Sequence, residues 1–122
     1  MNETVKEIVE RFYRSAAQKD DKWQEYLADN VSFSVAAKEK FVGKEMFIKA
    51  YTAFLQSVEK LEVRQLFIDN DTACAIINYD YTSSNGVTFR QDDAEVWKVA
   101  DGKIVSFTLY YDETEYRALM AQ

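Results

Sequence analysis

The stretch FRQDDAEVWKVADGKIVSFTLYYD, residues 89–112, predicts two long strands joined by a tight turn. Asp101 and Gly102 favour a hairpin turn, because glycine adopts a positive φ without steric cost. The segment after the turn, residues 103–111, is unbroken and rich in β-branched and aromatic residues. The stretch therefore predicts a long antiparallel hairpin near the end of the chain.

Acidic residues lie among the apolar residues of the first of these two strands. Strand side chains alternate between two faces, so Asp93, Glu95, Trp97 and Val99 are expected to share one face. A carboxylate beside a tryptophan on a sheet face lies either at a solvated rim or in a pocket. The functional interpretation depends on which of these two positions it occupies.

Length and charge limit the possible classes of protein. The 122 residues are enough for one domain, which we expect to cover residues 1–122. The net charge of -6 and the scattered basic residues argue against nucleic acid or a membrane surface as partner. No apolar run approaches the roughly 20 residues that span a bilayer. The polar N-terminal segment shows no signal pattern, so a cytoplasmic location is expected.

The chain contains no histidine, which narrows its chemistry. Ser-His-Asp and Cys-His catalysis and nearly all zinc sites are thereby excluded. Cys74, the only cysteine, is expected to be a buried thiol rather than a nucleophile. An oxygen-ligand calcium or magnesium site stays open, but EF-hand spacing is absent, and we predict no metal and no cofactor. Proton transfer at neutral pH would then need Asp, Glu, Tyr or Lys.

Hydrophobic periodicity predicts helices first and strands afterwards. Thr4 and Glu7 have capping-box spacing at the start of the first helix. The predicted helices cover residues 4–17, 22–28 and 44–60, with a last short helix over 112–122. The predicted strands cover residues 31–35, 61–69, 72–83, 87–100 and 103–111. This order implies an α+β fold with helices packed on one face of a curved antiparallel sheet.

The chain resembles the nuclear transport factor 2-like superfamily, in particular its SnoaL-like and ketosteroid-isomerase-like branch. The resemblance rests on VERFY (9–13), Trp23 with LADNVSF (27–33), GKE (43–45) and EVWKVADGKI (95–104) running into YYD (110–112). It implies one SnoaL-like domain, with a cone-shaped antiparallel sheet wrapped around three N-terminal helices and an apolar cavity open at one end. It also implies a homodimer formed through the outer face of the sheet.

The resemblance also implies which side chains face the cavity. On the last strand, Val105, Phe107, Leu109 and Tyr111 are expected inside, and Ser106, Thr108 and Tyr110 outside. On the neighbouring middle strand, Asn78 and Asp80 are expected inside. Ile77, Tyr79 and Tyr81 are then expected outside, where tyrosines would suit a dimer interface.

None of three catalytic sets known in the family is intact in this sequence. Ketosteroid isomerases use an Asp base at the end of the first strand, where residues 34–36 hold no carboxylate. Their oxyanion-hole Tyr corresponds to Phe12 or Tyr13, and their protonated Asp corresponds to a place near Glu95.

The catalytic residues of the family's cyclases and epoxide hydrolases are also incomplete in this sequence. Both use an Asp on the final strand, where this chain has Leu109. The epoxide hydrolases also use an Arg and an Asp two residues apart, where this chain has Asn78 and Asp80.

Three residues are the candidates for catalysis. Glu95 and Asp80 would serve as acid and base, and Tyr13 as a hydrogen-bond donor. The alternatives are a solvated Glu95 paired with Lys98 or Arg90, and a solvated Asp80 at its strand end. Asp92 and Asp93 are interpreted as rim or bulge residues. The expected ligand-binding residues, which are also candidates for plain core packing, are Trp97, Asn78, Tyr51, Phe33, Trp23, Phe54, Phe107 and Leu109.

The leading hypothesis is a protein that binds an apolar small molecule with one or two polar atoms. If the protein is an enzyme, the reaction would be isomerisation, cyclisation, dehydration or epoxide opening. The competing hypothesis is a non-catalytic dimeric module that binds a ligand or another protein, with a degenerate active site.

Overall fold

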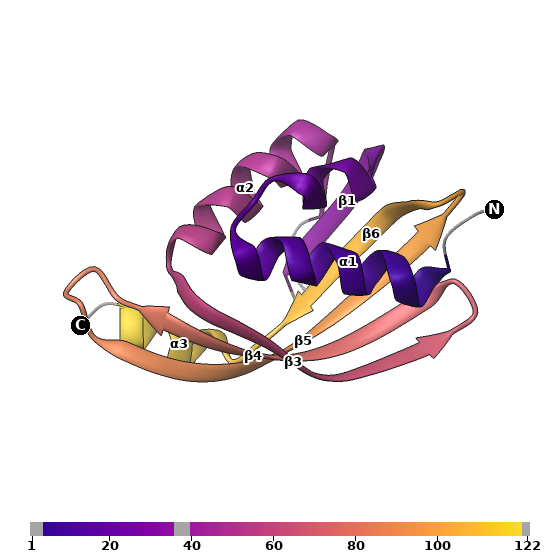
Figure 1. Ribbon diagram of the computed structural model, residues 1–122. Helices are drawn as coiled ribbons and strands as arrows, with labels where there is room; N and C mark the ends of the chain where they lie inside the picture. The colour runs from indigo at the N-terminus through magenta and orange to yellow at the C-terminus, as the bar shows by residue number, and fades with distance from the viewer. Residues whose placement is uncertain (1–3, 36–39, 121–122) are drawn as a thin grey trace.

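The computed structural model describes residues 4–35 and 40–120, and shows a strongly curved sheet with helices in its concave side (Figure 1). The helices are α1 (Val5–Gln18), the 3-10 helix η1 (Lys22–Tyr26), α2 (Lys44–Gln56) and α3 (Glu113–Met120). The strands are β1 (Leu27–Val35), β2 (Phe41–Val42), β3 (Val58–Asp69), β4 (Thr72–Thr82), β5 (Thr88–Ala100) and β6 (Lys103–Tyr110).

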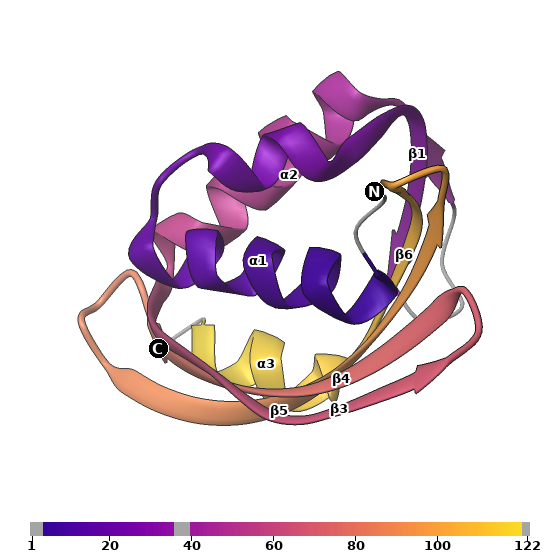
Figure 2. The same cartoon turned by 45° about the vertical axis from the view of Figure 1, so that its right-hand side comes forward.

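The six strands form one sheet in the order β2-β1-β6-β5-β4-β3. The strands β3 to β6 are an antiparallel meander, and β1 joins it by pairing parallel with β6. The predicted α+β class and curved sheet are confirmed. Figure 2 shows α3 on the same concave side as α1 and α2. The tight turn between β5 and β6 is also confirmed, with positive φ at both Asp101 (52°) and Gly102 (77°).

Several element boundaries differ from the predicted ones. The second helix ends at Tyr26, because Leu27 already pairs with Ile104 in the parallel β1–β6 ladder. The third helix ends at Gln56 rather than at residue 60, because Val58 begins β3 by pairing with Tyr81 of β4. The stretch between the predicted strand 31–35 and the predicted helix 44–60 contains the short strand β2. Residues 36–39 and 121–122 lie outside the described part of the chain.

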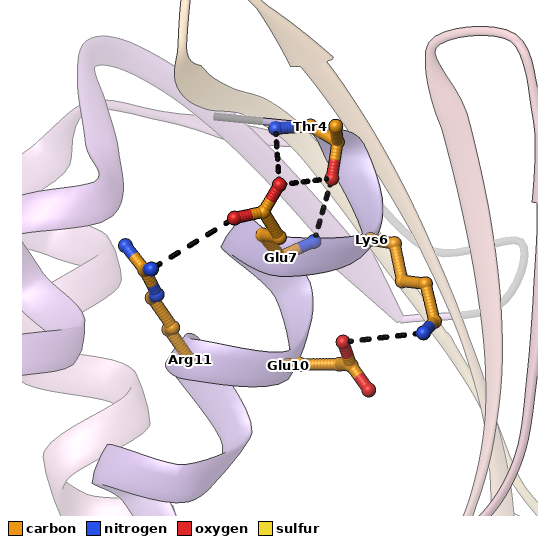
Figure 3. A network of polar contacts seen from close by, with 5 residues as sticks. All are labelled: Thr4, Lys6, Glu7, Glu10 and Arg11. Carbon is orange, nitrogen blue, oxygen red and sulfur yellow. Dashed lines mark hydrogen bonds and ion pairs between the residues drawn. The ribbon is translucent and has the colours of Figure 1, made fainter. Parts of the chain in front are cut away.

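The first helix begins at the predicted capping box. The Thr4 hydroxyl accepts a hydrogen bond from the Glu7 amide at 3.2 Å, and the Glu7 carboxylate accepts one from the Thr4 amide at 3.4 Å (Figure 3). These two bonds satisfy amides that the helix itself leaves without partners. On the exposed face, Glu7 also pairs with Arg11, and Lys6 pairs with Glu10, each at helical i,i+4 spacing (Figure 3).

The buried face of α1 carries the centre of the core. Phe12 is fully buried, and its ring contacts Trp97 of β5 at a centroid distance of 4.6 Å. It also contacts Trp23 of η1 and Tyr51 of α2, at 5.7 and 5.3 Å. One aromatic side chain therefore joins both helical layers to the sheet, and ring pairs of this kind add to the stabilisation given by area burial.

The predicted orientation of β4 is wrong. Ile77, Tyr79 and Tyr81 are buried on the concave face, whereas Asp80 forms an ion pair with Arg90 on the opposite face, with an N–O distance of 2.7 Å. Directly opposite residues of an antiparallel pair share a face. Ile77 lies opposite Asp93 of β5, which fixes the inward register of β4.

A bulge changes the expected orientation at the start of β6. Lys98 pairs with Ser106 and Val99 with Ile104, which leaves Val105 as an extra residue on β6. Ile104, rather than Val105, is therefore among the buried core residues. After the bulge the predicted alternation holds, because Phe107 is buried and Tyr110 is exposed.

None of the helices within residues 4–35 and 40–120 is both long and apolar enough to cross a membrane.

Two substitutions on β4 test the corrected register. Ile77→Ala should lower the free energy of unfolding by about 2–5 kcal/mol, because it removes a fully buried side chain. Asp80→Ala should leave it close to that of the wild type, because exposed ion pairs contribute little. Urea unfolding at pH 7 measures both. A large loss for Asp80→Ala together with a negligible one for Ile77→Ala would restore the opposite register.

Candidate functional site

A cavity of about 210 Å3 lies on the concave side of the sheet, and we call it the inner pocket. The helices α2 and α3 and the inner faces of β1, β4, β5 and β6 contribute to it. Its walls are mostly apolar, and two carboxyl groups, those of Asp93 and Glu95, lie among them. The remaining lining residues are Phe33, Val35, Phe47, Ala50, Tyr51, Phe54, Tyr81, Phe107, Leu109, Tyr111 and Tyr116.

Glu95 is held by hydroxyl groups on both of its carboxyl oxygens. The Tyr13 hydroxyl of α1 donates a hydrogen bond to Oε1, and the Tyr79 hydroxyl of β4 donates one to Oε2 at 2.7 Å. The Trp97 indole N–H in turn donates to the Tyr13 hydroxyl at 2.7 Å. Glu95 is 1% exposed, so this network is shielded from water and its geometry is fixed by the core.

Burial raises the pKa of Glu95 to about 8. The hydrogen bonds from Tyr13 and Tyr79 favour the carboxylate and oppose this shift, while the charge of Asp93 adds to it. The pKa values of Tyr13 and Tyr79 are raised well above 10, first by burial and then by the charge of Glu95. Both tyrosines therefore keep their protons and act as donors throughout the neutral range.

Asp93 differs from Glu95 in having a free carboxyl oxygen. Its Oδ2 accepts a hydrogen bond from the Tyr81 hydroxyl at 3.0 Å. Its Oδ1 is buried and has no hydrogen-bond partner among the described residues. Asp93 is 2% exposed, and burial raises its pKa to about 7, with the charge of Asp92 adding to the shift and the Tyr81 hydrogen bond opposing it.

The two carboxyls are therefore suited to different tasks. The oxygens of Glu95 are both engaged by tyrosine hydroxyls, so its position is fixed and its hydrogen-bonding capacity is largely used. Asp93 keeps an unpartnered oxygen and a pKa near neutral pH, which is the range in which a group exchanges protons most effectively. Of the two, Asp93 is the better placed to interact with a bound molecule.

The structure brings most of the predicted ligand-binding residues together. Glu95, the first catalytic candidate, lines the inner pocket. The predicted wall residues Tyr51, Phe33, Phe54, Phe107 and Leu109 line it as well.

Other predicted residues lie elsewhere. Asp80 is on the outer face of the sheet, and Asn78 donates a hydrogen bond to Asp92, so neither lines the inner pocket. Trp23 and Trp97 are buried in the core next to Phe12 rather than in the pocket wall.

The sequence did not distinguish Phe12 from Tyr13 as the residue that corresponds to the oxyanion-hole tyrosine of the family. Phe12 and Tyr13 are both buried, and neither lines the inner pocket. Phe12 fills the core, whereas Tyr13 reaches Glu95 from behind the pocket wall. Because the Tyr13 hydroxyl donates its hydrogen bond to Glu95, Tyr13 positions that carboxyl and does not itself bind a ligand in this arrangement.

Asp93 is the residue that the sequence interpretation placed at a rim or bulge. The signal that identifies it is the two-residue alternation, because Asp93 lies two positions before Glu95 and must share its face. Tyr79 and Tyr81 escaped prediction because the register of β4 was reversed. Within the described part of the chain, no group of three or more Cys, Asp or Glu side chains is placed to hold a metal ion.

The fold agrees with what sequence comparison finds. A family model described as SnoaL-like domain matches residues 9–107. The chain therefore belongs to the SnoaL-like family. No curated protein matches the chain significantly.

Solved structures of the same fold have low sequence identity to this chain. A putative SnoaL-like polyketide cyclase from Jannaschia sp. CCS1 is 14% identical with a TM-score of 0.84, over 97% of this chain and 92% of that one. SalBIII, an epoxide hydrolase/cyclase-like enzyme in pyran ring formation in salinomycin, is 19% identical with a TM-score of 0.81, over 90% and 92%. A de novo designed protein with a curved β-sheet is 21% identical with a TM-score of 0.79, over 96% and 92%. Likeness at this level shows the fold alone.

The raised pKa values of the two carboxyls predict how stability depends on pH. Between about pH 5 and 7 the folded state keeps protons that the unfolded state has lost, so the free energy of unfolding should fall as pH rises. Glu95→Gln should reduce this slope by up to about 1.4 kcal/mol per pH unit, which corresponds to one proton. Chemical denaturation at a series of pH values measures the slope.

Asp80→Asn is the matched control for this experiment. The pKa of Asp80 is lowered, mainly by its hydrogen bond from Arg90, so its contribution is lost only at more acidic pH. The control should therefore keep the wild-type slope between pH 5 and 7. A Glu95→Gln variant that also keeps the wild-type slope would show that Glu95 titrates like a solvated carboxyl.

Proposed function

We propose that this protein binds an apolar small molecule in the inner pocket and that Asp93 transfers a proton to or from it. The observation that carries the proposal is the Asp93 carboxyl, which is buried in an apolar pocket with one oxygen lacking a partner among the described residues. An unpartnered buried carboxyl oxygen is destabilising unless something binds to it. A ligand atom in the pocket would supply that partner.

The chemistry expected of such a site is general acid–base catalysis. The Asp93 carboxylate would take a proton from a carbon or oxygen of the ligand, and the protonated group would return it to another atom or to solvent. Glu95, held by Tyr13 and Tyr79 and with a pKa of about 8, would be mostly protonated at neutral pH and would add little negative charge to oppose ionisation of Asp93. This accounts for a proton-transfer reaction without a metal, and it fits the isomerase, cyclase, dehydratase or epoxide-opening class.

A family member without catalytic activity is the alternative that the same pocket allows. SalBIII is called an epoxide hydrolase/cyclase-like enzyme, but a designed protein shares this fold equally well. Ligand binding without turnover would correspond to this alternative.

We also propose a homodimer through the outer face of the sheet, where Phe67 and Tyr110 are exposed. Tyr79 and Tyr81 do not contribute to that face, because they are buried on the concave side.

The proposal predicts binding of 2-tetralone, 2-tetralol or 2-aminotetralin, three probes with one apolar bicyclic skeleton. A bound probe should raise the melting temperature in a concentration-dependent way. Ala50→Trp, at the pocket edge on α2, should abolish the rise by filling the space. Ala53→Trp, on the same helix but outside the pocket lining, is the matched control and should keep it. No shift from any of the three probes would contradict the proposed function.

Proton transfer is tested with 2-tetralone in D2O. The wild type should accelerate deuterium incorporation at the carbon next to the carbonyl, because Asp93 removes a proton there and returns a deuteron. Asp93→Asn should lower the accelerated rate by about 10²-fold, the usual contribution of a general base. NMR measures the exchange, with Asp80→Asn as a control that keeps the wild-type rate. Binding of 2-tetralone with no acceleration would favour the non-catalytic alternative.

A further inference from the structure

The inner pocket combines negative groups with aromatic rings. Asp93 and Glu95 are its carboxyls, and none of the described residues that line it is a lysine or an arginine. The sequence has no histidine. A buried carboxylate needs a positive partner, or it binds a proton instead. In the described lining, protons are therefore what neutralises these two groups when the pocket is empty.

Aromatic rings from three elements pack closely next to Asp93 in the lining of the inner pocket. Tyr81, which donates to Asp93, has its ring plane at 71° to that of Phe54 and at 80° to that of Tyr116. The corresponding centroid distances are 5.9 and 5.2 Å. The face of an aromatic ring attracts a cation within about 6 Å of its centroid. Phe54, Tyr81 and Tyr116 all line the inner pocket, and aromatic rings that line one pocket can hold an ammonium group as an aromatic cage.

The free oxygen of Asp93 gives this cage a polar contact. Oδ2 is used by Tyr81, whereas Oδ1 has no hydrogen-bond partner in the described part of the chain. An N–H group of an ammonium ion would donate to Oδ1 in a charge-assisted hydrogen bond, the stronger kind. A neutral amide or hydroxyl would form a weaker bond and would leave the ring faces without a charge to attract.

We propose that the inner pocket takes an apolar molecule that carries an ammonium group, with the charge held between Asp93 and the rings of Phe54, Tyr81 and Tyr116. The apolar body of the ligand would lie against other apolar lining residues such as Phe47 and Leu109. This inference rests on the proposed function, because it names the ligand class of the same pocket. It also gives Asp93 the carboxylate form that a base requires.

Binding of an ammonium group should release protons from the titratable groups of the inner pocket. The titratable groups that interact with Asp93 through a hydrogen bond or through charge are the hydroxyls of Tyr81 and Tyr116 and the carboxyls of Asp92 and Glu95. The pKa values of Tyr81 and Tyr116 are raised above 10, mainly by burial, so neither tyrosine titrates at neutral pH.

Around Glu95, the hydroxyls of Tyr13, Tyr51 and Tyr79 also have raised pKa values, with burial as the main cause. The carboxyls are therefore the groups that release protons when a cation arrives. Affinity for the cation should rise with pH, by up to tenfold per pH unit for each proton released.

A neutral ligand with a carbonyl group would behave in the opposite way. Its oxygen can only accept a hydrogen bond, so it binds more tightly to the protonated form of Asp93 than to the carboxylate form, although only the carboxylate form removes a proton from it. Its affinity should then fall as pH rises through the pKa of Asp93, about 7. The sign of the pH dependence therefore distinguishes the two ligand classes in one pocket.

The experiment compares 2-aminotetralin, which is an ammonium ion up to about pH 9, with 2-tetralone. Dissociation constants are measured by calorimetry from pH 5.5 to 8.5. We expect the amine to bind more tightly at pH 7.5, with its affinity rising about tenfold per pH unit below pH 7. Repeating the titration in phosphate and in Tris, which differ in ionisation enthalpy, should show the release of about one proton per amine bound.

Two variants of matched chemistry complete the test. Asp93→Asn should weaken amine binding at least tenfold and retain 2-tetralone binding, because the Asn amide still donates. Asp80→Asn, on the neighbouring strand but on the outer face, should change neither constant. Circular dichroism confirms that both variants are folded.

Three results would overturn the inference. The first is tighter binding of 2-tetralone than of the amine at every pH, and the second is amine affinity that does not change with pH. The third is amine affinity that Asp93→Asn leaves unchanged. In each case the proposed function survives, because the pocket still binds an apolar molecule. Failure of both probes to bind would instead contradict the proposed function itself.

Discussion

The hydrogen-bonded chain from Trp97 through Tyr13 to Glu95 is the contact on which both the core and the inner pocket depend. It joins the first helix to a strand more than eighty residues later in the sequence. Phe12, the neighbour of Tyr13, packs on the ring of Trp97 in the same layer. Because α1 packs against β5, that part of the concave side is filled. The inner pocket lies between α2, α3 and the sheet.

The inner pocket is stabilised less than the core beside it. Both Asp93 and Glu95 have raised pKa values because burial disfavours the charged form, and this reduces the free energy of unfolding as pH rises toward neutral. Apolar residues of similar size would avoid this cost. Functional sites are where proteins often keep such destabilising groups. Two buried carboxyls in a wall of aromatic rings therefore support the proposal that the inner pocket binds a ligand and transfers a proton.

Local sequence patterns were sufficient for much of the fold. Thr4 and Glu7 predicted the start of α1, and Asp101 and Gly102 predicted the β5–β6 turn, because both depend on neighbouring residues alone. The alternation around Glu95 predicted a carboxyl on the inner face. The same alternation contained Asp93, but a charged side chain two positions from the predicted pocket was interpreted as a rim residue.

The orientation of β4 could not be obtained in the same way. The family resemblance implied that Asp80 lies inside and that Ile77, Tyr79 and Tyr81 lie outside. Pairing with β5 decides the matter, and it depends on residues distant in sequence. The bulge at Val105 and the parallel pairing of β1 with β6 depend on tertiary contacts too. Such features have no local sequence signal, so they required the structure.

The most direct test of this account is a carbon-13 NMR titration of the side-chain carboxyls of Asp93 and Glu95 in the wild-type protein, with Asp93→Asn and Glu95→Gln used for assignment. The account predicts that the pair titrates with apparent pKa values of about 7 and about 8, since both groups are buried in an apolar pocket. Apparent pKa values near 4 for both carboxyls would show that they are solvated, and would contradict the assignment of the inner pocket as a site for acid–base chemistry.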